Sequence, residues 1–218
     1  MRKKTCGALI GIVLLALSSF YASGEVIVGT KKGISISSIY AMDSQSDPNQ
    51  EPMHREPMIG FDGGIFAEIS LSRRFSLETG LLFAQRGVRQ TGDDNSFSWV
   101  ATYFDIPVLA KIKFTFLDGL LRTSILLGPQ FSFALGSELH QDQAGTGDPG
   151  GEPEVNPFDL GFVIGVEGGL RLAGAYYLFL DVRYVLGFLP LVAPEDAQGQ
   201  NPRSSMFSIL AGIGFRLL

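Results

Sequence analysis

Hydrophobic and polar residues alternate with a period of two along most of the chain. In the stretch YFDIPVLAKIKF (103–114), every second residue is apolar, and Asp105, Lys111 and Lys113 stand among the residues between them. A period of two is that of a β-strand, because successive side chains of a strand point to opposite faces. The pattern therefore predicts a strand with one apolar face and one polar face.

The same alternation predicts eight strands, at about residues 26–39, 58–70, 74–89, 98–114, 120–136, 158–172, 176–189 and 204–217. Long polar segments follow the first, third, fifth and seventh strands, and short turns follow the second, fourth and sixth. Successive connections between antiparallel strands lie at opposite ends, so all the long loops share one side. This arrangement predicts an all-β fold: an eight-stranded antiparallel up-and-down transmembrane β-barrel with long extracellular loops and short periplasmic turns.

The composition of the two faces bears on whether the barrel is soluble or embedded in lipid. One face consists of Leu, Ile, Val and Phe with almost no charge, and the other is rich in Gly and Ser. A soluble barrel, such as a lipocalin, would turn the apolar face inward. Small residues suit a narrow lumen, and aromatic residues near the predicted strand ends, such as Phe75, Tyr176 and Trp99, suit interfacial girdles. We therefore favour the membrane barrel and keep the soluble barrel as the alternative.

The first 24 residues have the features of a secretory signal peptide. Three basic residues at positions 2–4 precede the apolar run CGALIGIVLLALSSF, and the small residues Ala22 and Gly24 follow it. The run is shorter than the roughly 20 residues that a membrane-spanning helix needs. The sequence thus predicts a signal peptide at residues 1–24, cleaved near Gly24/Glu25, and a mature barrel domain at residues 25–218.

Cleavage would change both the redox chemistry and the charge of the chain. The only cysteine, Cys6, leaves with the signal peptide, so the mature protein would have no thiol and no disulfide. Loss of three basic residues and no acidic ones changes the formal net charge from −5 to −8. The long loops carry thirteen acidic residues and only two basic ones, Arg55 and Arg203. This charge argues against a nucleic-acid partner.

The polar face of the predicted strands carries seven acidic and seven basic residues. In a barrel of eight strands the interior is just wide enough for side chains to fill it, and buried charges require partners. We therefore predict a lumen closed by ion pairs; an ion-selective path is the alternative. The predicted network comprises Asp62, Glu68, Glu78, Arg86, Asp105, Lys111, Lys113, Arg122, Asp159, Glu167, Arg171, Asp181, Arg183 and Arg216.

Candidate catalytic and metal-binding residues are few. The two histidines, His54 and His140, both fall in predicted long loops, and nearness of His140 to Ser137 in the sequence is weak support for a catalytic triad. The acidic loop DQAGTGDPGGEPE lacks the regular spacing of a calcium-binding loop. We predict no catalytic residue, cofactor or metal site, and a hydrolase at the outer rim of the barrel is an alternative.

Several motifs in order resemble a known family. They are a Gly-rich second strand (GFDGGIFAEIS), FSLETG, DIPVLAK, LLGPQ and VRY, which together resemble the PorT-like outer-membrane β-barrel family. The resemblance covers nearly the whole mature chain. It implies an eight-stranded barrel in a Gram-negative outer membrane, in a family whose founding member is associated with type IX secretion.

Two features depart from the expected pattern. The chain ends FRLL, where such barrels usually end on an aromatic residue. Lys32 falls on the lipid-facing positions of the first strand unless a bulge, at Gly29 or Gly33, shifts it. We predict a non-enzymatic outer-membrane protein with a structural or partner-binding role, surrounded by outer-membrane lipid. Its partners would be envelope or secretion proteins that bind the loops or periplasmic turns, and the alternative role is a component of a secretion apparatus.

Overall fold

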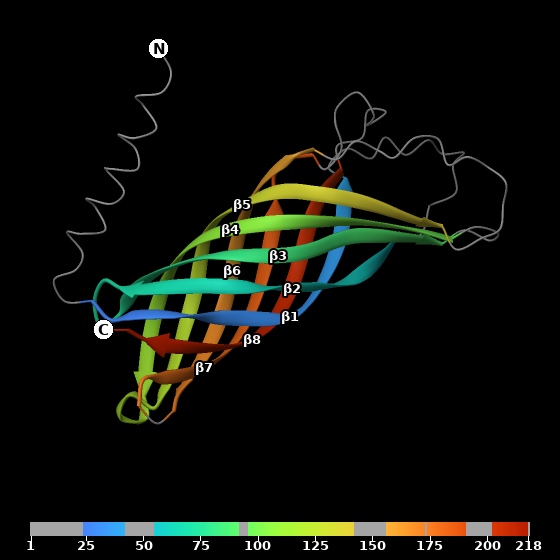
Figure 1. The fold of residues 1–218 in the computed structure, drawn as a ribbon. Helices are drawn as coiled ribbons and strands as arrows, with labels where there is room; N and C mark the ends of the chain where they lie inside the picture. Colours follow the sequence, from blue (N-terminus) through green and yellow to red (C-terminus); the bar gives the residue numbers. More distant parts are fainter. Residues whose placement is uncertain are drawn as a thin grey trace, which may run out of the picture.

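The protein is a closed barrel of eight antiparallel strands, seen in a computed structural model that describes residues 24–41, 55–91, 96–141, 156–172, 174–190 and 202–217. Each strand pairs with its neighbours in the chain, and β8 pairs with β1 to close the barrel (Figure 1). The predicted fold is confirmed. The strands are β1 (Val26–Ala41), β2 (Arg55–Ser70), β3 (Phe75–Thr91), β4 (Ser96–Phe116), β5 (Leu121–Gln141), β6 (Phe158–Arg171), β7 (Tyr176–Gly187) and β8 (Pro202–Arg216). The predicted signal peptide lies outside the described residues apart from Gly24.

At the end that carries the long loops, six of the eight strands extend further than predicted, β6 begins at the predicted residue, and β7 ends at Gly187, two residues before its predicted end. β5 continues to Gln141, and His140 pairs with Ser98 of β4, so the assignment of His140 to a loop was wrong. β4 and β5 are each 21 residues long, and pairing between them maintains the strand conformation beyond the apolar segments from which we inferred the boundaries. His54 lies outside the described residues.

Short turns join the strands at the opposite end. In the β2–β3 turn, the backbone N–H of Phe75 donates a hydrogen bond to Ser72 Oγ at 3.0 Å. The 3-10 turn η1 (Leu117–Gly119) joins β4 to β5, and its Gly119 has a φ of 88°, a left-handed conformation that glycine adopts without strain. The first strand starts at this same end, where the backbone N–H of Leu217 donates to the carbonyl of Val26 at 2.8 Å.

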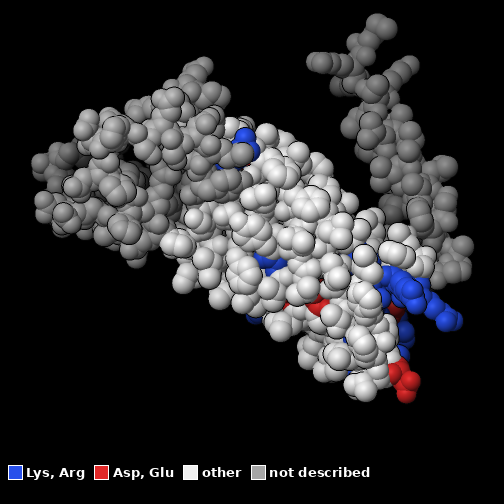
Figure 2. Space-filling model, turned by 180° about the vertical axis from the view of Figure 1, so that it is seen from behind, with Lys and Arg blue, Asp and Glu red and all other residues white. Residues whose placement is uncertain are grey.

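Burial alternates along the strands as the sequence pattern requires. Buried residues line the lumen, and the outer surface carries exposed Leu, Ile, Val and Phe side chains from all eight strands. Figure 2 shows that one face of the barrel is mostly uncharged and that charged side chains gather mainly at one end. No helix among the described residues is long and apolar enough to cross a membrane.

The pairing of β1 settles the position of Lys32. The register is continuous from Val26 to Ser37 against β2 and from Ile27 to Ala41 against β8. A bulge would appear as a shift in this register, and none occurs along either edge of the strand. The bulge alternative was therefore wrong, and Lys32 lies exposed on the outer face.

A charged lumen as the candidate functional site

The inward positions of the strands bring acidic and basic side chains together in the lumen. At the end with the short turns, the Nζ atom of Lys31 lies 2.9 Å from Glu78 Oε1 and 2.5 Å from Glu167 Oε2. It also donates to Asp181 Oδ2 at 3.0 Å. These residues come from β1, β3, β6 and β7, so a single ammonium group joins strands from opposite sides of the barrel.

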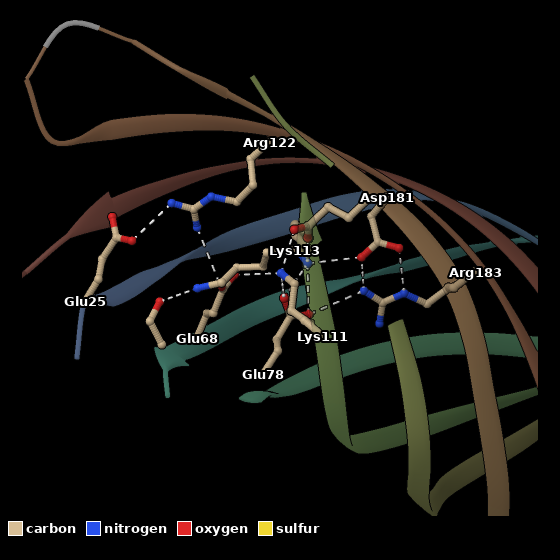
Figure 3. Close-up of polar contacts among 11 residues, drawn as sticks. Glu25, Glu68, Glu78, Lys111, Lys113, Arg122, Asp181 and Arg183 are labelled. Atoms are coloured by element: carbon tan, nitrogen blue, oxygen red, sulfur yellow. Dashed lines mark hydrogen bonds and ion pairs between the residues drawn. The ribbon is translucent and has the colours of Figure 1, made fainter. Parts of the chain in front are cut away.

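Lys111 of β4 is a second centre of the same kind. Its Nζ atom lies 2.7 Å from Glu68, 2.8 Å from Glu78 and 2.5 Å from Glu167, and its side chain is fully buried (Figure 3). Carboxylate oxygens of these three glutamates lie within 4.8 Å of one another, a spacing that could also hold a metal ion. The ammonium groups of Lys31 and Lys111 both donate hydrogen bonds to these carboxylates. The three glutamates are therefore occupied by two lysine side chains.

Arginine side chains extend this group of charges in both directions. Arg183 pairs with Asp181 and lies 3.7 Å from Glu78. Arg122 lies 3.1 Å from Glu25 and 3.5 Å from Glu68, near the mouth of the barrel (Figure 3). We call the whole group the periplasmic charge cluster: Glu25, Lys31, Glu68, Glu78, Lys111, Lys113, Arg122, Glu167, Asp181, Arg183 and Arg216.

A second, smaller group lies nearer the end that carries the long loops. Arg86 Nη2 lies 2.7 Å from Asp105 Oδ2, and Arg86 Nη1 lies 3.5 Å from Asp159 Oδ2. Gln130 donates to the same Asp105 oxygen at 2.8 Å. Ser132 and Ser204 complete this extracellular charge cluster through contacts to Arg86 and Asp159, respectively.

Buried apolar side chains separate the two charge clusters. On β3, Ala84 lies between Glu78 and Arg86; on β4, Leu109 lies between Asp105 and Lys111. On β6, Val163 takes the same place between Asp159 and Glu167. These three side chains belong to one buried cluster with Leu126, Val185 and Met206. The lumen is thus filled in layers, with charge, apolar and charge again along its length.

Twelve of the fourteen predicted network residues form ion pairs in these clusters, and two do not. Asp62 is buried, but neither of its carboxylate oxygens has a hydrogen-bond partner among the described residues. Arg171 is only half-buried at the last position of β6, where water reaches the strand end, and it forms no ion pair within the described part of the chain. For these two residues the prediction of pairing was wrong.

Sequence reasoning missed Lys31, which contacts the carboxylates of three residues, as many as Lys111 does. Lys31 and Lys32 are adjacent in the sequence, and the prediction considered only Lys32, which falls on the outward-facing positions. The alternation itself held the signal, because Lys31, Ser35 and Ser37 share a parity with the other buried positions of β1. Glu25 was also missed, since it precedes the first strand.

A cleft opens at the periplasmic mouth of the lumen. It has a volume of about 1110 Å³ and lies between the β2–β3 turn and the adjoining ends of β4 and β5. Its basic lining residues are Arg73, Arg74, Lys113 and Arg122, and its only acidic one is Glu25. Arg73 and Arg74 are exposed, so the surface of this cleft is positively charged.

A mostly uncharged outer surface, a filled polar lumen and short turns at one end define an integral β-barrel of the bacterial outer membrane. The chain belongs to the family described as outer membrane protein beta-barrel domain, which matches residues 21–192. The protein is therefore an outer-membrane protein, and membrane lipid surrounds it. The narrower PorT-like assignment stays a prediction. A search of curated proteins found no match.

Solved outer-membrane proteins share this fold. OprG from Pseudomonas aeruginosa superposes with a TM-score of 0.57 at 10% identity, over 89% of this chain and 96% of that chain. Neisserial surface protein A gives a TM-score of 0.44 at 14% identity, over 89% and 99% of the two chains. Ail, the attachment invasion locus protein of Yersinia pestis, gives 0.43 at 12% identity, over 88% and 99%. At 10% identity the similarity to OprG shows the fold alone.

Proposed function

We propose that this protein is a non-enzymatic, non-conducting outer-membrane barrel that serves as a structural platform for an envelope partner. The observation that carries the proposal is the contact of Lys111 with three buried carboxylates at 2.5–2.8 Å. Such a contact uses the charges of the lumen to hold strands together. A conducting pore needs its charged groups exposed to water and to passing ions.

The layered filling of the lumen supports the same proposal. An ion that crossed the barrel would have to displace two sets of short ion pairs and the apolar layer between them. Displacing buried pairs is costly, because each charge left without a partner must be stabilised in a medium of low dielectric constant. Most charged side chains of the lumen are also paired with one another, so they are not available to bind a substrate.

The periplasmic cleft supports the partner-binding part of the proposal. Exposed Arg73 and Arg74 lie at its edge, where the short β2–β3 turn holds them in place. Guanidinium groups bind carboxylates and phosphates with two parallel hydrogen bonds. We propose that this cleft binds an acidic segment of a periplasmic or envelope protein.

Recordings of single-channel current in planar lipid bilayers test the proposed closure. Purified protein, folded into vesicles and shown by its heat-dependent gel mobility to be a closed barrel, should give no steady ion-selective current. An open porin recorded in the same bilayers serves as the control for detection. A steady current from the parent protein would refute the proposal and favour a selective channel.

A further inference from the structure

Lys32 is a charged residue on a surface that is otherwise built for lipid. It is exposed on the outer face of β1, between Thr30 and Ile34, which are also exposed. No ion pair or side-chain hydrogen bond involves it in the described part of the chain. The outer faces of the neighbouring strands carry Ile65, Phe83 and Ile209 nearby.

Lys32 lies near the middle of the apolar band. Along β1, which runs from Val26 to Ala41, it lies well inside both ends and somewhat nearer the periplasmic one. On the adjacent β8 the outward residue paired with it, Ala211, stands midway between Phe207 and Phe215. A lysine on the lipid face of a barrel reduces the free energy of unfolding most at this depth, and the penalty becomes small only near the interfaces.

The surface around Lys32 is unusually open. Its partners across the two strand pairings are Gly63 on β2 and Ala211 on β8, so small residues flank it on both sides. A groove of about 540 Å³ begins at Thr30, two residues before Lys32, and crosses β2 and β3 to Ile106 of β4; Lys32 stands beside the groove and does not line it. Small and polar outward residues lie along it, including Ala67 and Thr79, with Ile65, Leu81 and Ile106 at its sides.

We propose that this groove binds a membrane-spanning segment of a different outer-membrane protein, and that an acidic side chain of that segment pairs with Lys32. The charge and the cavity are independent observations on one continuous surface. The proposal rests on the outer-membrane location and not on the closure of the lumen or on the periplasmic cleft.

Charge and depth select this occupant over two others. The outward positions described for the membrane-spanning part of the strands include no acidic residue, so a second copy of the chain would bring two lysines together. The phosphates of lipids lie at the edges of a band about 25 Å tall. From its middle, the four-carbon stem of a lysine does not reach that depth without distorting the bilayer.

Site-specific photocrosslinking in native outer membrane tests the proposal. A benzophenone amino acid at position 30 should crosslink to a second protein, whereas the same probe at Ile164, on β6, should not. Lys32→Arg should preserve this product, and Lys32→Leu should reduce it at least tenfold while the barrel keeps its heat-dependent mobility. Mass spectrometry should identify a partner with Asp or Glu in a membrane-spanning segment, and exchanging the charges, with Lys32→Glu and Lys at the partner's acid, should restore the product.

Several outcomes would overturn the proposal: no protein crosslink at position 30, crosslinks only to a second copy or to lipid, or a product unchanged by Lys32→Leu.

A second measurement uses the isolated protein in phosphatidylcholine vesicles. Without the partner, Lys32 should only destabilise the barrel, so Lys32→Leu should raise the folding equilibrium constant roughly 30-fold or more. A decrease would show that Lys32 stabilises the chain by itself and would also refute the proposal.

Discussion

Replacing Lys111 with methionine removes the cation on which three buried glutamates converge. Methionine has a similar length and fills the volume of the alkyl stem, so the change isolates the ammonium group. In the parent protein this group lies 2.7, 2.8 and 2.5 Å from Glu68, Glu78 and Glu167. After the substitution their oxygens, which lie within 4.8 Å of one another, repel without the charge between them.

The remaining contacts set the size of the effect. Glu78 and Glu167 keep Lys31 at 2.9 and 2.5 Å, and Glu68 keeps Arg122 at 3.5 Å. Breaking a buried ion pair costs about 3–5 kcal/mol when one charge is left alone. Because every glutamate retains at least one cation, we expect a loss of about 3 kcal/mol, at the lower end of that range.

Urea unfolding in lipid vesicles measures this loss, with the fluorescence of the single tryptophan, Trp99, as the probe. Lys113→Met is the matched control. Lys113 lies 3.9 Å from Glu68, so its replacement should reduce the free energy of unfolding by less than the replacement of Lys111 does. Adding Glu68→Gln to Lys111→Met should recover part of the loss, since it removes one of the repelling charges. A Lys111→Met protein as stable as the parent, or a double variant that loses the sum of both single losses, would refute the reasoning.

Three further predictions concern the outer face, the strand packing and the location. In urea unfolding in vesicles, Leu81→Arg and Ile164→Arg should each destabilise the barrel by about 2–4 kcal/mol. Arg73→Ala in the exposed β2–β3 turn should change the stability by less than about 0.5 kcal/mol. Equal effects at these positions would show that the faces are misassigned. Gly33→Val should lower the urea midpoint, because a Cβ atom there would lie 1.9 Å from the carbonyl oxygen of Ile209, and Gly136→Ala, with no atom within 4 Å, should not. Cell fractionation should recover a chain that begins at or near Glu25 in the outer membrane with heat-dependent gel mobility, and recovery as a soluble periplasmic protein would contradict the predicted export.

The alternation of residues was sufficient to predict the barrel and most of its lumen. It placed Asp105, Lys111 and Lys113 inside because a strand has only two faces and the other face of this strand was uninterrupted Phe, Ile, Val and Ala. The same rule applied without an added bulge to β1 would have placed Lys31 inside and Lys32 outside. A charged residue on a lipid face contradicts the usual pattern, and that contradiction now marks the surface proposed to bind a partner.

The contacts across the lumen could not be predicted in the same way. Lys31 on β1 meets Glu167 on β6 because the two strands face each other across the barrel, and no sequence spacing expresses that distance. Asp62 has the same parity and burial as its paired neighbours, but its carboxylate oxygens accept no hydrogen bond and form no ion pair among the described residues. Pairing thus depends on strand tilt and side-chain length, which the alternation does not encode.

Nuclear magnetic resonance of the lysine ammonium groups tests most directly the claim that the lumen is closed by paired charges. In ¹⁵N-labelled protein in lipid nanodiscs, ammonium protons exposed to water exchange too fast to be seen at neutral pH and room temperature. The account predicts slowly exchanging Nζ signals for Lys31 and Lys111, the second of which disappears in Lys111→Met. Fast exchange at both groups in the folded protein would show that water fills the periplasmic charge cluster, and it would contradict the account.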